Sequence, residues 1–182
     1  MAKKVEKRYH VWFSWEHEKE ERWINDLSRQ GLHLTGAGAI SSKFERDESV
    51  RYTYRIDHQP GLGKGEKWND YVALYRDAGW EYAGKSGAVW FYFRRPWSPD
   101  ESPQLYTDRD SIVAYYNRIR RLMVAMFFVN LIILCLNGIN LVPRIHSSLW
   151  GIVVPVLAIY AAVFLLLGIG IIKIGRKIKK IL

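Results

Sequence analysis

The chain has 182 residues and a mass of 21.3 kDa, which leaves room for one ordinary domain and a small additional segment and excludes large multidomain enzymes. Its single cysteine, Cys135, cannot pair within the chain, which argues against a disulfide-stabilised secreted protein. The net charge of +9 is uneven, because residues 1–107 carry 17 basic and 16 acidic side chains whereas residues 108–182 carry 10 basic and 2 acidic ones.

The N-terminal part begins with the pattern of a strand, a helix and two further strands. Tyr9, Val11, Phe13 and Trp15 alternate with other residues, which predicts a strand over residues 9–15. The acidic stretch 16–21 is interpreted as a solvated helix start, with an apolar stripe at Trp23, Ile24 and Leu27 and an end at Gly31. Extended segments are expected after Gly31 and again through Phe44.

A second pattern of the same kind follows 48 residues later. Trp23, Ile24, Gly31, Leu32, Leu34 and Gly36 correspond at this spacing to Tyr71, Val72, Gly79, Trp80, Tyr82 and Gly84. The second copy is predicted to contain strands at 50–57, 80–83 and 89–94 and a helix at 66–78. The expected fold is therefore α+β, a duplicated strand-helix-strand-strand unit in which two helices back one face of an antiparallel sheet, as in ferredoxin-like two-layer sandwiches.

Aromatic residues are unusually frequent, with 8 Trp and 11 Tyr, and the predicted strands carry them on both faces. A two-layer fold leaves one sheet face uncovered unless a ligand, a partner or a second copy covers it. Plain structural aromatics are the alternative. The candidate contact residues on this face are Trp12, Tyr54, Trp80, Trp90 and Tyr92, with Arg55 as a polar anchor.

The C-terminal third contains two long uncharged runs, Leu122–Val142 and Leu149–Ile172, which predict two transmembrane helices joined as a hairpin. A proline-bearing segment precedes them and is interpreted as a linker. The predicted organisation is a cytoplasmic α+β domain at 1–95, a linker at 96–107, a juxtamembrane helix at 108–121, transmembrane helices at 122–142 and 149–172, and a basic tail at 173–182.

Basic residues precede the first run and follow the second, whereas the short connection between them carries only Arg144. The positive-inside rule then places both termini in the cytoplasm, in a multi-pass protein of the cell membrane. The positive excess belongs to these flanks, so it does not indicate nucleic-acid binding.

Three amides in the first run, Asn130, Asn137 and Asn140, lie near one helix face and are expected to point at protein rather than lipid. Asn130 is expected at the depth of Tyr160, and Asn137 or Asn140 near the backbone that Pro155 leaves unpaired. Gly151, Ala158 and Ala162 form a small-residue strip suited to close helix packing.

Motifs of catalysis are not found in the sequence. The histidines and the cysteine lack metal-ligand spacing, and there is no nucleophile elbow or phosphate-binding loop. We therefore expect no catalytic residue, no metal and no cofactor, and a protein that is not an enzyme.

Several segments resemble one bacterial family of unknown function. They are Trp12–Trp23 (WFSWEHEKEERW), Gly31–Leu34 (GLHL), Tyr52–Asp57 (YTYRID) and Asp77–Tyr82 (DAGWEY), with Trp90–Arg94 close behind. In these segments the chain resembles the domain-of-unknown-function 2812 family. The resemblance implies a membrane-tethered cytoplasmic domain in Gram-positive bacteria, often encoded beside a PadR-type regulator, with no established activity. A weaker likeness in architecture is to the gyrase-inhibitor-like superfamily, whose members bind drug-like ligands.

Two hypotheses of function follow. In the first, the chain is a membrane-anchored sensing or partner-binding module that holds a hydrophobic or aromatic ligand, or a regulatory partner, on its aromatic sheet face. In the second, it is a small accessory subunit of a membrane complex and acts through its transmembrane hairpin. Expected partners are the lipid bilayer, a membrane or regulatory protein, and a second copy of the chain.

Overall fold

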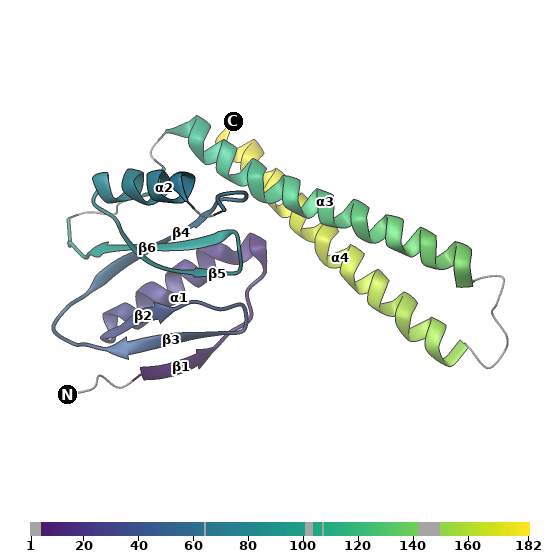
Figure 1. Cartoon of the computed structure of the whole chain (residues 1–182), viewed down its shortest axis with the longest axis horizontal. Coiled ribbons are helices and arrows are strands. Elements are labelled where there is room, and N and C mark those ends of the chain that lie inside the picture. The colour runs from purple at the N-terminus through teal and green to yellow at the C-terminus, as the bar shows by residue number, and fades with distance from the viewer. Residues whose placement is uncertain (1–4, 64, 101–103, 107, 142–149) are drawn as a thin grey trace. The chain divides into compact units, whose positions relative to one another are not determined.

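The computed structural model (Figure 1) describes residues 5–63, 65–100, 104–106, 108–141 and 150–182. The chain divides into two compact units, Met1–Ser111 and Ile112–Leu182. The predicted connection at 143–148 and parts of the predicted linker, residues 101–103 and 107, lie outside the described residues.

The first unit contains the order strand-helix-strand-strand twice. The first half has β1 (Val5–Tyr9), the short η1 (Ser14–Glu16), α1 (His17–Arg29), β2 (Leu32–Gly36) and β3 (Ser41–Arg46). The second half has β4 (Tyr52–His58), α2 (Glu66–Asp77), β5 (Glu81–Ser86) and β6 (Trp90–Pro96). Each half forms a three-stranded antiparallel sheet, in the orders β1-β3-β2 and β4-β6-β5. The predicted α+β class and element order are confirmed.

The two halves share two structural features at positions 48 residues apart. Gly31 and Gly79 end α1 and α2 with φ values of +74° and +80°, a left-handed conformation that favours glycine. The register of the β2–β3 pair shifts between Leu34 and Gly36, and that of the β5–β6 pair shifts between Tyr82 and Gly84. The same irregularity therefore interrupts both sheets at matching positions.

The first strand was predicted in the wrong place. β1 covers Val5–Tyr9 and pairs with β3, whereas residues 10–13 have no regular structure and lead into η1. The large side chains that indicated a strand have another environment, because Trp12 and Phe13 line a cavity and Phe13 also stacks on Trp15 with ring centroids 4.7 Å apart.

The sheet arrangement also differs from the single two-layer sandwich that was expected. There are two three-stranded sheets, and the helices lie on opposite faces of the second one. Tyr54, Ile56 and Tyr92 of that sheet pack in one core with Ile24 and Leu27 of α1. On the other face, Phe91 and Phe93 pack in a second core with Tyr75 of α2. Both faces of β6 are therefore buried, and the open aromatic face predicted from the sequence is wrong.

Helix α1 lies along β4, the edge strand of the second sheet, and satisfies its backbone with side chains. Asn25 Oδ1 accepts a hydrogen bond from the Tyr54 N–H at 2.8 Å, and Asn25 Nδ2 donates one to the Tyr54 carbonyl at 3.0 Å. Ser28 Oγ bonds both backbone groups of Tyr52, and Glu21 Oε2 accepts from the Ile56 N–H at 3.1 Å. A helix thus takes the place of a neighbouring strand at an edge that would otherwise be open.

The second unit consists of two helices that run antiparallel (Figure 1), α3 (Arg109–Leu141) and α4 (Trp150–Ile181). The start of α3 is capped by Asp108, whose Oδ1 accepts a hydrogen bond from the Ser111 N–H at 2.7 Å. Both helices are long and apolar enough to cross a membrane. Helix α3 includes most of the segment predicted as a separate juxtamembrane helix, 108–121. Helix α4 includes most of the segment predicted as a basic tail, 173–182. Many of their apolar side chains are exposed, among them Ile132, Ile139, Ile159 and Leu165.

Candidate functional site

A cavity of about 210 Å³ lies between the two halves of the first unit. Its walls come from the segment after β1, the first turn and a half of α1, the β2–β3 loop, the end of β5 and β6. The lining residues are His10, Trp12, Phe13, Ser14, His17, Glu20, Gly38, Ala39, Ser86, Trp90 and Tyr92. Because an apolar cavity of roughly 150 Å³ suffices for benzene, this one accommodates a ligand of one or two rings.

The aromatic part of the wall is held by contacts among rings. The Trp12 ring lies 6.2 Å from that of Trp23, centroid to centroid, and the His10 ring lies 4.9 Å from Trp23. Trp90 contacts the His58 ring at 4.7 Å and stacks with His17 at 5.9 Å. These contacts hold both tryptophan rings in place, so this part of the wall is preorganised.

Two buried polar atoms of the lining have no hydrogen-bond partner among the described residues: His10 Nδ1 and Trp12 Nε1. The other ring nitrogen of His10, Nε2, bonds Ser42 Oγ at 2.9 Å. Burial lowers the pKa of His10, which favours the neutral ring. The indole N–H of Trp12 is always a donor, and an unsatisfied buried donor costs about 1–3 kcal/mol.

Glu20 supplies a buried carboxyl group to the same cavity. Its side chain is turned inward on α1, the residue is 8% exposed, and its Oε1 accepts a hydrogen bond from the Tyr92 hydroxyl at 2.8 Å. Burial raises the pKa of Glu20, an effect that the Tyr92 hydrogen bond partly offsets. Burial and the adjacent Glu20 carboxyl raise the pKa of Tyr92 as well, so the tyrosine keeps its proton and remains the donor.

Three of the six residues predicted for a ligand face line this cavity: Trp12, Trp90 and Tyr92. The other three lie elsewhere. Tyr54 is fully buried in the first core, where its hydroxyl accepts a hydrogen bond from the Leu34 N–H, and Trp80 is buried in the second core. Arg55 pairs with Glu21, its Nη1 lying 3.1 Å from Glu21 Oε1.

A family model described as "Protein of unknown function (DUF2812)" matches residues 16–128, which is more than half of the chain. The chain belongs to the DUF2812 family. The matched region begins at the end of η1 and ends inside α3, so it includes the cavity residues of α1 and β6. No curated protein and no solved structure matches the chain.

His10, His17 and Glu20 of this DUF2812 chain were not among the candidate residues predicted from the sequence. The stretch 16–21 was interpreted as solvated, but His17 and Glu20 are buried and the Glu21 side chain is only 20% exposed. The signal was present, because Glu20, Ile24 and Leu27 lie at helical spacing and so share the apolar face of α1. An acidic residue on the buried face of a helix indicates a specific partner.

A second buried carboxyl group, Asp57, lies on the other face of the second sheet. It accepts hydrogen bonds from the hydroxyls of Tyr71 at 2.7 Å, Tyr75 at 2.9 Å and Tyr106 at 2.8 Å. Tyr106 belongs to the segment predicted as a linker, and its neighbour Leu105 packs on the second core. The hydroxyl groups and the carboxylate of this cluster satisfy one another, and through Tyr106 the cluster fastens residues 104–106 to the rest of the first unit.

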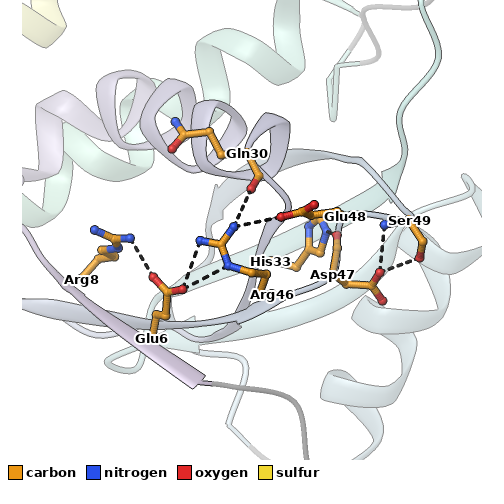
Figure 2. Close-up of polar contacts among 8 residues, drawn as sticks. All are labelled: Glu6, Arg8, Gln30, His33, Arg46, Asp47, Glu48 and Ser49. Carbon is orange, nitrogen blue, oxygen red and sulfur yellow. Dashed lines mark hydrogen bonds and ion pairs between the residues drawn. The ribbon is translucent and has the colours of Figure 1, made fainter. Parts of the chain in front are cut away.

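Other candidate sites of the first unit are exposed. Arg46 of β3 contacts Glu6 of β1, the Gln30 carbonyl and Glu48, and neighbouring bonds join His33 to Asp47 and Asp47 to Ser49 (Figure 2). These groups satisfy one another at the surface, where ion pairs contribute little. Two larger hollows of about 460 and 450 Å³ border α2, but their charged lining residues, Arg76, Glu81 and Lys85, are exposed.

In the second unit the amides have different partners from those expected. Asn137 Nδ2 donates to the Tyr160 hydroxyl at 3.1 Å and so joins α3 to α4, whereas Asn130 and Asn140 bond the carbonyls of Met126 and Leu136 in their own helix. Phe127 and Phe164 form a second contact between the helices, with ring centroids 5.0 Å apart. Gly151, Ala158 and Ala162 lie on α4, where Gly151 has no atom within 4 Å of the place of a Cβ.

Proposed function

We propose that this protein is a membrane-tethered binding module whose first unit holds a small aromatic ligand in the cavity between its two halves. The observation that carries the proposal is the cavity itself, in which the rings of Trp12 and Trp90 and the buried carboxyl group of Glu20 line about 210 Å³ of space. Close packing alone would leave no such space beside a buried carboxyl group.

The module acts by occupancy and not by catalysis. The polar groups of the cavity are suited to orient a ligand, and the Glu20 carboxyl is engaged by the Tyr92 hydroxyl. Binding of a ligand would order both halves of the unit around it, which is how such a module senses a compound.

The second unit anchors the module in a membrane, with both termini on the cytoplasmic side. Three observations support this part: the length and apolar composition of α3 and α4, the exposed apolar side chains along them, and the basic residues that flank the apolar runs. A regulatory protein on the same membrane is the partner that such an arrangement suits.

A binding measurement with two small aromatic probes tests the proposal. The full chain in nanodiscs of zwitterionic lipid is titrated with 1-methylnaphthalene and with N-methylquinolinium, and tryptophan fluorescence is followed. We expect saturable quenching by at least one probe. Ala39 lies at the exposed rim of the cavity, so Ala39→Phe should weaken binding at least tenfold by occupying the mouth.

The matched control is Ala88→Phe, on the turn between β5 and β6 and outside the lining of this cavity. It should leave binding unchanged. The proposal is wrong if neither probe binds saturably, or if Ala39→Phe and Ala88→Phe bind as the wild type does.

The alternative, an accessory subunit that acts through its hairpin, rests on the Asn137–Tyr160 bond, because one polar pair in an apolar helix pair specifies how the helices meet. That hypothesis predicts that a membrane partner copurifies with the chain and is lost on substitution of Asn137.

A further inference from the structure

The charge of the cavity lining is one-sided. Glu20 is an acid on the buried face of α1, and the lining contains no lysine or arginine. The remaining titratable groups of the lining are His10, His17 and Tyr92. Of these, Tyr92 donates a hydrogen bond to Glu20, and His10 favours its neutral form.

A buried carboxylate without a counter-charge is costly, and burial accordingly raises the pKa of Glu20. One hydrogen bond from Tyr92, itself bonded to Ser86, leaves the second carboxyl oxygen, Oε2, with acceptor capacity. A ligand that brings a positive charge would pair with the carboxylate and remove the cost of its burial.

The aromatic walls favour the same kind of ligand. The faces of tryptophan rings carry partial negative charge, and a cation within about 6 Å of such a face is attracted to it, most strongly where water is excluded. Trp12 and Trp90 come from different segments, the one after β1 and β6, and line the same cavity as Glu20. A flat cation in this cavity would have both rings and the Glu20 carboxyl group among its neighbours.

We propose that the cavity selects a small aromatic cation of one or two rings, whose charge pairs with Glu20 and whose ring system lies between Trp12 and Trp90. This inference rests on the proposed function, since it names the chemical class of the ligand for the same cavity.

The test compares two probes of nearly the same shape, N-methylquinolinium and 1-methylnaphthalene, which differ in charge. Affinities are measured by calorimetry on the full chain in zwitterionic nanodiscs, where the lipid surface does not attract the cation. We expect the wild type to bind the cation at least tenfold more tightly. The Glu20→Gln variant should bind the cation no more tightly than the neutral probe. Its affinity for the neutral probe should stay within threefold of the wild-type value.

Glu18→Gln is the matched control on the same helix, because Glu18 is not part of the lining. It should keep the tenfold preference. Equal binding of the two probes to the wild type would overturn the cation proposal and leave the proposed function intact, whereas no binding of either probe would overturn both. The comparison on the wild type decides the matter even if Glu20→Gln does not fold.

Discussion

Asn25 of α1 bonds both backbone groups of Tyr54 on β4, donating to its carbonyl at 3.0 Å and accepting from its N–H at 2.8 Å. A helix side chain here replaces the strand that would otherwise pair with an edge. The bond joins the first half of the unit to the second, across the boundary beside which the cavity lies. The stability of the cavity therefore depends on a polar contact as well as on the apolar core.

Replacing Asn25 with Ala should lower the free energy of unfolding by about 2 kcal/mol, because two backbone groups of a partly buried strand lose their partner. The midpoint of urea unfolding, followed by near-ultraviolet circular dichroism of the full chain in detergent, measures this. Asn69→Ala on the exposed surface of α2 is the control and should change stability by less than about 0.5 kcal/mol. Equal effects of the two substitutions would contradict the role of Asn25.

Glu21 should make stability depend on pH. Burial raises its pKa from 4.5 to about 7, although the Arg55 ion pair opposes the shift. A carboxyl whose pKa is raised in the folded state stabilises the fold at low pH, and this contribution is lost as pH rises from about 4.5 to about 7.

Glu21→Gln removes this pH-dependent contribution. The difference between its free energy of unfolding and that of the wild type should therefore shift in favour of the variant by about 2–3 kcal/mol between pH 4.5 and pH 8. Urea midpoints across this range give the difference. Glu66→Gln, at the exposed start of α2, should follow the wild-type profile. A Glu21→Gln profile parallel to the wild type would show that Glu21 titrates as an exposed acid.

Tyr106 fastens the end of the first unit through its hydroxyl, which lies 2.8 Å from Asp57 Oδ1 and 3.2 Å from the Tyr75 hydroxyl. Tyr106→Phe keeps the ring and removes the donor, so it should cost about 1 kcal/mol and speed amide hydrogen exchange in residues 104–106. Tyr9→Phe, at a residue that is 73% exposed, serves as the control and should have no effect. Unchanged exchange in Tyr106→Phe would mean that the hydroxyl does not hold this segment.

The Asn137–Tyr160 bond should couple α3 and α4. A double-mutant cycle of Asn137→Leu and Tyr160→Phe, measured by unfolding of the full chain in detergent, should give a coupling of about 0.5–1.5 kcal/mol. Asn130 bonds its own helix, so the same cycle with Asn130→Leu should give no coupling to Tyr160. Equal coupling of Asn130 and Asn137 to Tyr160 would contradict the Asn137–Tyr160 bond.

Much of the fold could be predicted, because periodicity and glycine stops record local structure. The ends of α1 and α2 follow from Gly31 and Gly79, and residues 122–141 and 150–172 of the uncharged runs lie within α3 and α4. The error at β1 shows the limit of this reasoning. An alternation of large side chains indicates a strand only if alternate residues face sheet and solvent, and here Trp12 faces a cavity instead.

The cavity was harder to predict because it is a tertiary feature. Trp12, Trp90 and Tyr92 were selected as aromatic residues on strands, and the same criterion selected Tyr54 and Trp80, which lie in the cores. The cavity residues differ from the core residues in their neighbours from other elements, such as Glu20 from α1. The residue pattern of a strand contains no information on such neighbours. The helical spacing of Glu20 with Ile24 was the available signal.

The indole N–H signal of Trp12 tests the central claim most directly, because the Trp12 side chain lines the cavity and its buried N–H has no partner among the described residues. Nitrogen-15 spectra of the full chain in zwitterionic nanodiscs, assigned by single Trp→Phe variants, are recorded during titration with N-methylquinolinium. We predict saturable shifts of the Trp12 and Trp90 indole signals and none of Trp97, which is 40% exposed and outside the cavity lining. Shifts that never saturate, or that affect Trp97 as strongly as Trp12, would contradict a ligand site between the two halves.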